Sequence, residues 1–160
     1  MKRKIGMFEV SVILFFYILP TISIIINLMI RGDKFIVETI VKWVVFWGIG
    51  LRLFTCGLKQ ALQPRFTAND IFGSYDEKAY PIVRELGFAN ICIGLCGILS
   101  LYNEKFRIAA IMIGGLYYFF VLLQHIFRKQ KNSTEVFVTI TDLSILLEIC
   151  VPTFYILIFK

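Results

Sequence analysis

The sequence predicts an all-α integral membrane protein, a helical bundle with about five transmembrane helices. Composition is the first reason: of the 160 residues, 58% are hydrophobic and only 18% are charged, whereas soluble domains have roughly half and a quarter, respectively. The mean hydropathy of +0.78 agrees with this. The second reason is the pattern, because the apolar residues gather in runs of about 20, the length needed to cross a bilayer. These runs lack the alternation of membrane β-barrel strands, which excludes a barrel.

The apolar runs define the helices of a single transmembrane domain over residues 1–160. As a helix, a run of about 20 residues spans roughly 30 Å, which matches the hydrocarbon layer of a bilayer. The expected helices cover about residues 5–30, 35–57, 82–101, 106–127 and 136–159. Pro20 lies in the middle of the first of them and is expected to kink it.

The loop at residues 58–81 is the one long polar stretch of the sequence. It is too polar to cross the bilayer, but apolar residues such as Phe66, Ile71 and Phe72 recur within it. We therefore expect a short interfacial segment between the second and third helices. The stretch from Phe66 to Pro81 is also a candidate lid.

The basic residues predict how the chain is oriented in the membrane. The net charge of +6 does not indicate a nucleic-acid partner, because the basic residues cluster at the ends of the apolar runs. With the N-terminus inside, nine lie on the cytoplasmic side (Lys2, Arg3, Lys4, Lys59, Arg65, Lys78, Arg128, Lys129 and Lys131) and five outside (Arg31, Lys34, Lys105, Arg107 and Lys160). The positive-inside rule therefore predicts a cytoplasmic N-terminus and an external C-terminus.

Polar residues within the apolar runs mark where a function would lie. Such residues are costly in lipid and usually face a bundle interior, a wet cavity or the interface. In the predicted topology they concentrate in the cytoplasmic half of the bundle, where they form a candidate ligand-binding cluster. Its members are Arg52, Arg84, Glu85, Asn90, Tyr118, His125, Asp142 and Glu148.

Several members of this cluster have a purely structural alternative. Arg84 and Glu85 begin the third helix, where an arginine reaches the headgroups and an acid complements the helix dipole. Asn90 suits a hydrogen bond between helices. His125, the only histidine, suits an anchoring role at the interface beside the basic run that follows it.

Small residues indicate where helices pack closely. Gly87, Gly94 and Gly97 on the third helix, with Ala110, Gly114 and Gly115 on the fourth, predict that these two helices form a tight hairpin. The four cysteines lie in or beside apolar runs and lack the spacing of a metal or redox motif. They are therefore expected to be packing residues.

One stretch of the sequence resembles a known family. Glu85 to Asn90 reads Glu-Leu-Gly-Phe-Ala-Asn at the opening of a helix, and Phe66-Thr67-Ala68 precedes it. These elements resemble an uncharacterised family of small prokaryotic integral membrane proteins with an RELGFAN-type motif. The general appearance also resembles, more loosely, the DoxX-like proteins, some of which are linked to respiratory or redox chemistry. The resemblance implies a bundle in a prokaryotic plasma membrane and supplies no established reaction.

The sequence leaves three functions open. The first is binding or transport of a small ligand, a lipid or an ion through the polar cluster. The second is a redox-chain or enzyme subunit of DoxX-like type, and the third is a structural partner of a larger membrane complex. The sequence has no catalytic triad order, no histidine pair and no phosphate loop, so enzyme activity is not favoured and no cofactor is expected. The expected partner is the lipid bilayer, with a homo-oligomer or another membrane protein left open.

Overall fold

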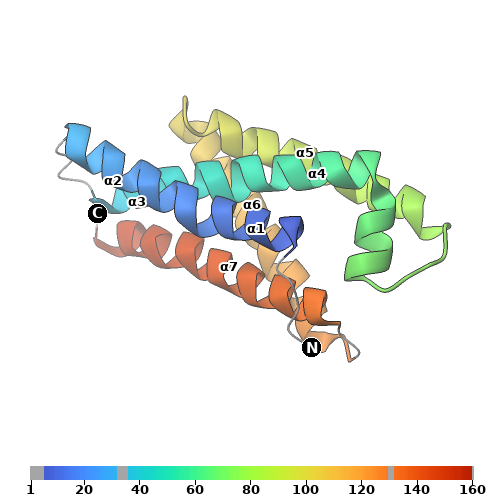
Figure 1. Cartoon of the computed structure of the whole chain (residues 1–160). Coiled ribbons are helices and arrows are strands. Elements are labelled where there is room, and N and C mark those ends of the chain that lie inside the picture. The colour runs from blue at the N-terminus through green and yellow to red at the C-terminus, as the bar shows by residue number, and fades with distance from the viewer. Residues whose placement is uncertain (1–5, 32–35, 130–131, 160) are drawn as a thin grey trace.

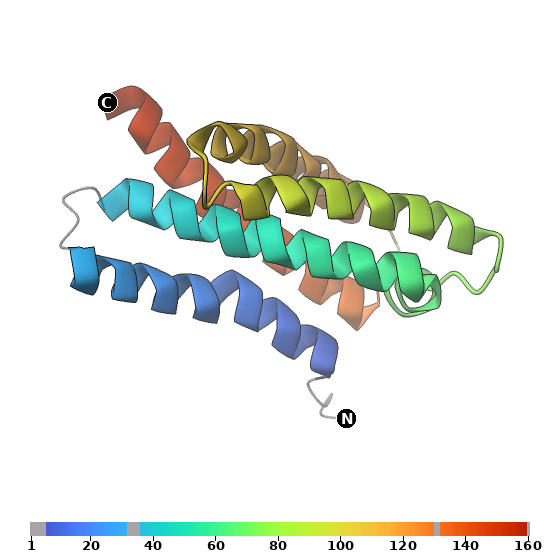
Figure 2. The ribbon, with the colours of Figure 1, turned by 90° about the horizontal axis from the view of Figure 1, so that it is seen from above.

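The computed structural model of the chain describes residues 6–31, 36–129 and 132–159. These residues form helices and connecting turns, with no strand among them, so the predicted all-α class is confirmed. They form five rods in chain order, at residues 7–31, 36–62, 79–99, 104–127 and 133–159. The rods lie side by side (Figure 1; Figure 2). In chain order the elements are α1 (Met7–Ile13), η1 (Leu14–Ile18), α2 (Leu19–Arg31), α3 (Ile36–Val44), η2 (Val45–Leu51), α4 (Arg52–Leu62), η3 (Phe66–Ile71), α5 (Ala79–Leu99), α6 (Glu104–Phe127) and α7 (Ser133–Phe159).

The outer surface of the bundle is apolar, as expected for a protein in lipid. Four helices in the described part of the chain are long and apolar enough to cross a membrane: Met7–Ile30, Ala79–Leu99, Glu104–Phe127 and Ser133–Phe159. Large apolar side chains point outward from them, and Met29 and Ile158, for example, are 80% and 69% exposed. An apolar surface of this extent is stable in lipid and not in water. The fold is therefore consistent with a multi-pass membrane protein.

The first rod departs from α-helical geometry just before its proline. The π-helical segment η1 ends at Ile18, and Pro20 is the second residue of α2. Proline has no backbone N–H, so it cannot donate to the carbonyl of Phe16 one turn earlier. The helix that is expected to kink at Pro20 thus contains a π-helical segment directly before the proline.

The second rod contains another π-helical segment, η2, which joins α3 to α4 without a break. A π-helical turn leaves backbone carbonyls without their usual intrahelical donor. The carbonyl of Gly48 finds one in Tyr118 of α6, whose hydroxyl donates to it over 2.7 Å. Ile49, in the same segment, is fully buried in the core with Val45, Leu53 and Ile145.

The glycines of α5 pack against the second rod and not against α6. A Cβ placed at Gly57 of α4 would lie 2.5 Å from the Gly87 carbonyl oxygen and 2.7 Å from the Ile91 nitrogen of α5. Gly97 meets the backbone of Gly50 in η2 in the same way. The prediction that these glycines pack against α6 is therefore wrong, because the helix they contact is the second rod. A stripe of small residues reveals that some backbone comes close, but not which one.

The predicted loop at residues 58–81 is largely helical. The second rod continues five residues past the expected boundary at residue 57 and ends at Leu62. Gln63 then leaves the helical conformation (φ −132°, ψ 62°), as is usual for a residue that precedes a proline. The π-helical segment η3 follows, and Gly73 turns the chain with φ +65°. Figure 1 shows η3 at the same end of the bundle as the start of α1, the end of α6 and the start of α7.

Candidate functional site

A cavity of about 160 Å³ lies inside the bundle near the η3 end. Side chains from α1, η1, α4, η3, α5, α6 and α7 line it, so it is formed by all five rods together with η3. Its apolar lining includes Phe8, Val12, Phe16, Leu53, Ile71, Phe72, Leu86, Val121 and Val138. Its polar lining consists of Arg52, Cys56, Gln60, Thr67, Asn90, Tyr117, Tyr118, Gln124, His125, Thr141 and Asp142.

The polar lining from α4 follows directly from helix geometry. Arg52, Cys56 and Gln60 are spaced four residues apart, which places them one above the other on one face of a helix. The same helix also packs closely against α5, and Gly57 makes this possible because it has no side chain. One helix thus supplies both a tight contact and a polar wall.

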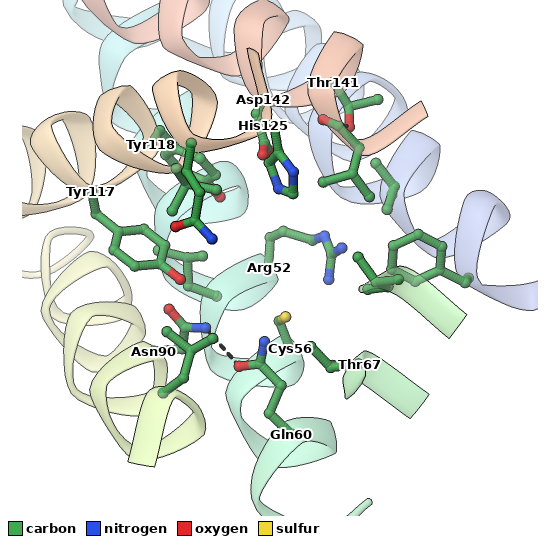
Figure 3. Close-up of a pocket in the computed structure, with 18 of the residues that line it drawn as sticks. Arg52, Cys56, Gln60, Thr67, Asn90, Tyr117, Tyr118, His125, Thr141 and Asp142 are labelled. Carbon is green, nitrogen blue, oxygen red and sulfur yellow. Dashed lines mark hydrogen bonds between the residues drawn. The ribbon is translucent and has the colours of Figure 1, made fainter. Parts of the chain in front are cut away.

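Arg52 and Asp142 are the two oppositely charged side chains of the cavity wall that lack a hydrogen-bond partner. No hydrogen bond or ion pair within residues 6–31, 36–129 and 132–159 reaches either side chain. The Arg52 guanidinium lies instead near two aromatic rings, with Cζ 5.5 Å from the centre of Phe8 and 5.8 Å from that of Phe16. Asp142 is only 7% exposed. Figure 3 shows Arg52 reaching into the middle of the cavity, with Asp142 on one side and Gln60 on the other.

An amide pair forms the wall between α4 and α5. The Asn90 amide nitrogen donates to the Gln60 side-chain oxygen over 2.7 Å. Asn90 is 1% exposed, and its own side-chain oxygen has no hydrogen-bond donor among the described residues. The predicted helix-to-helix hydrogen bond therefore accounts for the nitrogen of this side chain, and Figure 3 shows the hydroxyl of Tyr117 on α6 beside the amide of Asn90.

The histidine at the η3 end of the cavity is held by a buried glutamate. His125 Nδ1 lies 3.0 Å from Glu135 Oε1, and Glu135 is 1% exposed. Arg128 Nη1 lies 3.4 Å from the same carboxylate oxygen. Because a carboxylate only accepts hydrogen bonds, His125 donates from Nδ1, and its Nε2 is left for other partners. Phe72 stacks on the imidazole, with ring centres 6.1 Å apart.

Five of the eight predicted site residues line this cavity, and three do not. Arg52, Asn90, Tyr118, His125 and Asp142 line it. The Tyr118 hydroxyl donates its proton to the Gly48 carbonyl, so this side chain lines the cavity but has no proton left to donate to a guest.

The remaining three predicted residues lie elsewhere. Arg84 and Glu85 are exposed on α5, because that helix turns the face of Gly87 and Asn90 inward. Glu148 is half-buried further along α7 and accepts a hydrogen bond from the Ser144 hydroxyl over 3.1 Å.

Sequence reasoning missed Gln60 and Glu135, which matter most to the polar geometry. The sequence predicts Gln60 in the polar loop, because the predicted second helix ends at residue 57 whereas α4 ends at Leu62. Glu135 reads as an ordinary acid in the first turn of a helix. Its position ten residues after His125, across a short turn between antiparallel helices, was the signal that could have paired the two.

The side chains of the cavity wall can donate and accept hydrogen bonds and include groups of opposite charge type. Within the described residues no three His, Cys, Asp or Glu side chains come together as metal ligands do. The walls offer a guanidinium, a carboxyl group and an amide oxygen, surrounded by aromatic and aliphatic groups. This combination is typical of a site for a small polar molecule.

Comparison with known proteins gives one result. A family of unknown function, DUF6790, matches residues 10–159. Searches of the curated proteins and of the solved structures found no match. The expectation of an uncharacterised family is confirmed, while the family match does not bear on the DoxX-like resemblance or on the RELGFAN-type motif. With nearly its whole length matched, the chain belongs to DUF6790, a family of unknown function.

Proposed function

We propose that this protein binds a small, neutral, polar molecule in the cavity between Arg52 and Asp142, within the membrane. The observation that carries the proposal is that these two charged side chains line one cavity and neither makes a hydrogen bond within the described chain. Charged groups in a membrane interior are normally paired or hydrogen-bonded. A guest that accepts from Arg52 and donates to Asp142 satisfies both, and the Asn90 oxygen offers a second acceptor.

The charges and volume of the cavity define the class of guest. The guanidinium of Arg52 donates hydrogen bonds and the carboxyl group of Asp142 accepts them, so a neutral guest with one acceptor and one donor satisfies both. A cavity of about 150 Å³ in another protein holds benzene, so a cavity of about 160 Å³ suits a group of about six non-hydrogen atoms. A carboxamide with a short apolar tail has the required donor, acceptor and size.

The second rod, Ile36–Leu62, is proposed as a fifth span beside the four apolar helices. It carries four charged residues, namely Glu38, Lys42, Arg52 and Lys59. The rod is of similar length to the others and lies among them (Figure 2). Arg52, the deepest of the four charges, faces the cavity and not the lipid, which makes a membrane position tolerable.

The η3 end of the bundle is proposed to face the cytoplasm. Among the described residues, that end carries Lys59, Arg65, Lys78, Arg128 and Lys129, whereas the opposite end carries Arg31, Lys105 and Arg107. The positive-inside rule favours the richer end as cytoplasmic. Alkaline phosphatase fused to the C-terminus of the chain is then expected to be active and a green fluorescent protein fused there to be dark. The reverse pattern would reject this orientation.

The binding proposal is tested with three molecules of matched size. Butyramide, butyrate and butylammonium are added separately to the protein in lipid nanodiscs, and the thermal midpoint Tm is measured. At about tenfold above its Kd, butyramide is expected to stabilise by about 1.4 kcal/mol, which raises Tm by about 3–6 °C. Butyrate and butylammonium are expected to raise it less.

Two arginine variants locate the effect. Arg52→Met is expected to abolish the response to butyramide, while Arg84→Met, which removes an exposed arginine of α5, is expected to preserve it. The proposal fails if no probe raises Tm, or if Arg52→Met responds as the parent does.

A further inference from the structure

We infer that η3 is a movable wall of this cavity, and that two side chains at the α6–α7 turn, Arg128 and Asn132, hold it shut. This inference rests on the proposed function, because a gate has a role only where a cavity exchanges its contents. The stretch from Phe66 to Pro81 is a candidate lid by sequence alone, and the structure adds the hydrogen bonds that hold it and the end of the bundle at which a guest would enter.

The segment η3 closes the cavity with its own side chains. Thr67 and Ile71 of η3 line the cavity, as does Phe72, which follows directly. Thr67 is 4% exposed and Ile71 is 9% exposed, so the inner face of the segment is sealed against the bundle. Moving η3 outward would open the cavity at the end of the bundle.

The bonds that hold this wall come from side chains at another turn. The last carbonyls of a helix have no donor within the helix. Here the Asn132 amide nitrogen donates to the carbonyls of Asp70 and Ile71, over 3.1 Å in each case. The Arg128 guanidinium donates to the carbonyl of Phe72. The C-terminal end of η3 is thus capped by residues about 60 positions later in the sequence.

The holding side chains are themselves fixed to the bundle. Arg128 lies 3.4 Å from the buried carboxylate of Glu135 in α7. Asn132 accepts from the Glu135 backbone nitrogen over 2.8 Å and so caps the start of α7. Both are therefore anchored to α7 whether or not η3 is bound.

The chain on either side of η3 permits such a movement. Gln63 interrupts the helix before it, and Gly73 interrupts it afterwards with a positive φ of 65°. A Cβ at Gly73 would meet nothing within 4 Å. The segment is thus connected at each end through a non-helical residue and not through continuous helix.

The chain contains a natural probe of the cavity in Cys56, which lines it from α4. With Cys92, Cys96 and Cys150 replaced by serine, iodoacetamide can alkylate Cys56 alone, with loss of iodide. Iodoacetamide is a small neutral amide, of the same class as the proposed guest. Its reaction rate, followed by intact-protein mass spectrometry, reports access to the cavity and requires no bound ligand.

The decisive variant is Asn132→Asp. An aspartate still caps α7, because its oxygen accepts from the Glu135 nitrogen, but it has no N–H to donate to the Asp70 and Ile71 carbonyls. The loss of two hydrogen bonds is expected to raise the rate at Cys56 about tenfold or more. The matched control is Asn103→Asp, since Asn103 caps α6 at the opposite end by accepting from the Lys105 nitrogen over 2.9 Å. It is expected to leave the rate unchanged.

A second pair of variants covers the other bond. Arg128→Met is expected to raise the rate at Cys56, whereas Arg107→Met, which removes a donor to the Ser100 carbonyl at the opposite end, is not.

General loosening of the bundle is detected with a chain that retains only Cys96, which packs against the core away from the cavity lining. A rise at Cys56 alone supports the gate. An unchanged rate at Cys56, or equal rises at Cys56 and Cys96, overturns it.

The outcomes separate the two proposals. If butyramide binds but Asn132→Asp leaves the rate at Cys56 unchanged, the gate is rejected and the binding site stands. If the rate rises but no probe shifts Tm, the wall moves as inferred and the proposed guest class is rejected.

Discussion

Gly94→Leu in α5 is expected to lower the thermal midpoint of the protein in nanodiscs by about 6–12 °C, which corresponds to about 3 kcal/mol or more. Even a Cβ at this position would come within 2.7 Å of the Phe54 Cα atom and 2.8 Å of the Gly50 carbonyl oxygen, and it would meet the Phe54 backbone nitrogen. These are backbone atoms, which cannot move aside as a flexible side chain can. The helices must therefore separate, and the contact between α5 and the second rod is lost along its length.

The matched control is Gly115→Leu in α6. A Cβ at Gly115 meets nothing within 4 Å, so there is room for a larger side chain there. Its Tm is expected to stay close to that of the parent, although helix propensity favours leucine over glycine to a similar degree at both sites. Equal changes in the two variants would contradict the close backbone contact between α5 and the second rod.

Glu135→Ala is expected to destabilise the protein by about 3–5 kcal/mol, the usual cost of removing one partner from a buried ion pair. The Glu135 carboxylate is 1% exposed and serves both His125, at 3.0 Å, and Arg128, at 3.4 Å. Its loss leaves the His125 Nδ1 donor buried without an acceptor. The measurement is again Tm in nanodiscs, compared with the parent.

Glu104→Ala is the comparison for that result. Glu104 also lies 3.4 Å from an arginine, Arg107, but its side chain is 86% exposed. Exposed ion pairs contribute little because water screens them, so Tm is expected to be essentially unchanged. If the two variants behaved alike, burial of Glu135 would not be the source of its effect.

The helices could be predicted from the sequence because each depends on a local signal. An uninterrupted apolar run of about 20 residues forms a helix in lipid wherever it packs. Each helix expected from an apolar run therefore corresponds to a rod in the structure. The boundary at residue 57 was wrong, because Lys59, Gln60 and Gln63 look like loop residues although Gln60 faces inward on α4.

The composition of the cavity could be predicted only in part, because depth and direction are different properties. Sequence position gives the depth of a residue along a helix, and this is how Arg52, Asn90 and Asp142 came to be grouped. It does not give the direction in which the side chain points around the helix axis. Arg84 and Glu85 lie toward the same end of the bundle but face outward, and no local pattern distinguishes them.

The partner of a contact is harder still to predict. The small residues of α5 indicate a close neighbour, but the neighbour could be any adjacent helix, and it is the second rod and not α6. The same limit hid Glu135, whose burial depends on the end of α6 lying against the start of α7.

The π-helical segment η2 controls the rotation of everything that follows it in the second rod. In an α-helix each residue turns by about 100°, so a turn that holds one extra residue shifts the rest of the helix by that angle. Arg52 comes directly after this segment, and Cys56 and Gln60 lie below it on the same face. If the rod kept α-helical pitch throughout, that face would turn about a quarter of a revolution away from the cavity. The glycines that fit against α5 would turn with it. The π-helical segment thus sets the rotation of α4 about its axis. With that rotation, Gly57 faces α5 and the polar side chains of Arg52, Cys56 and Gln60 face the cavity.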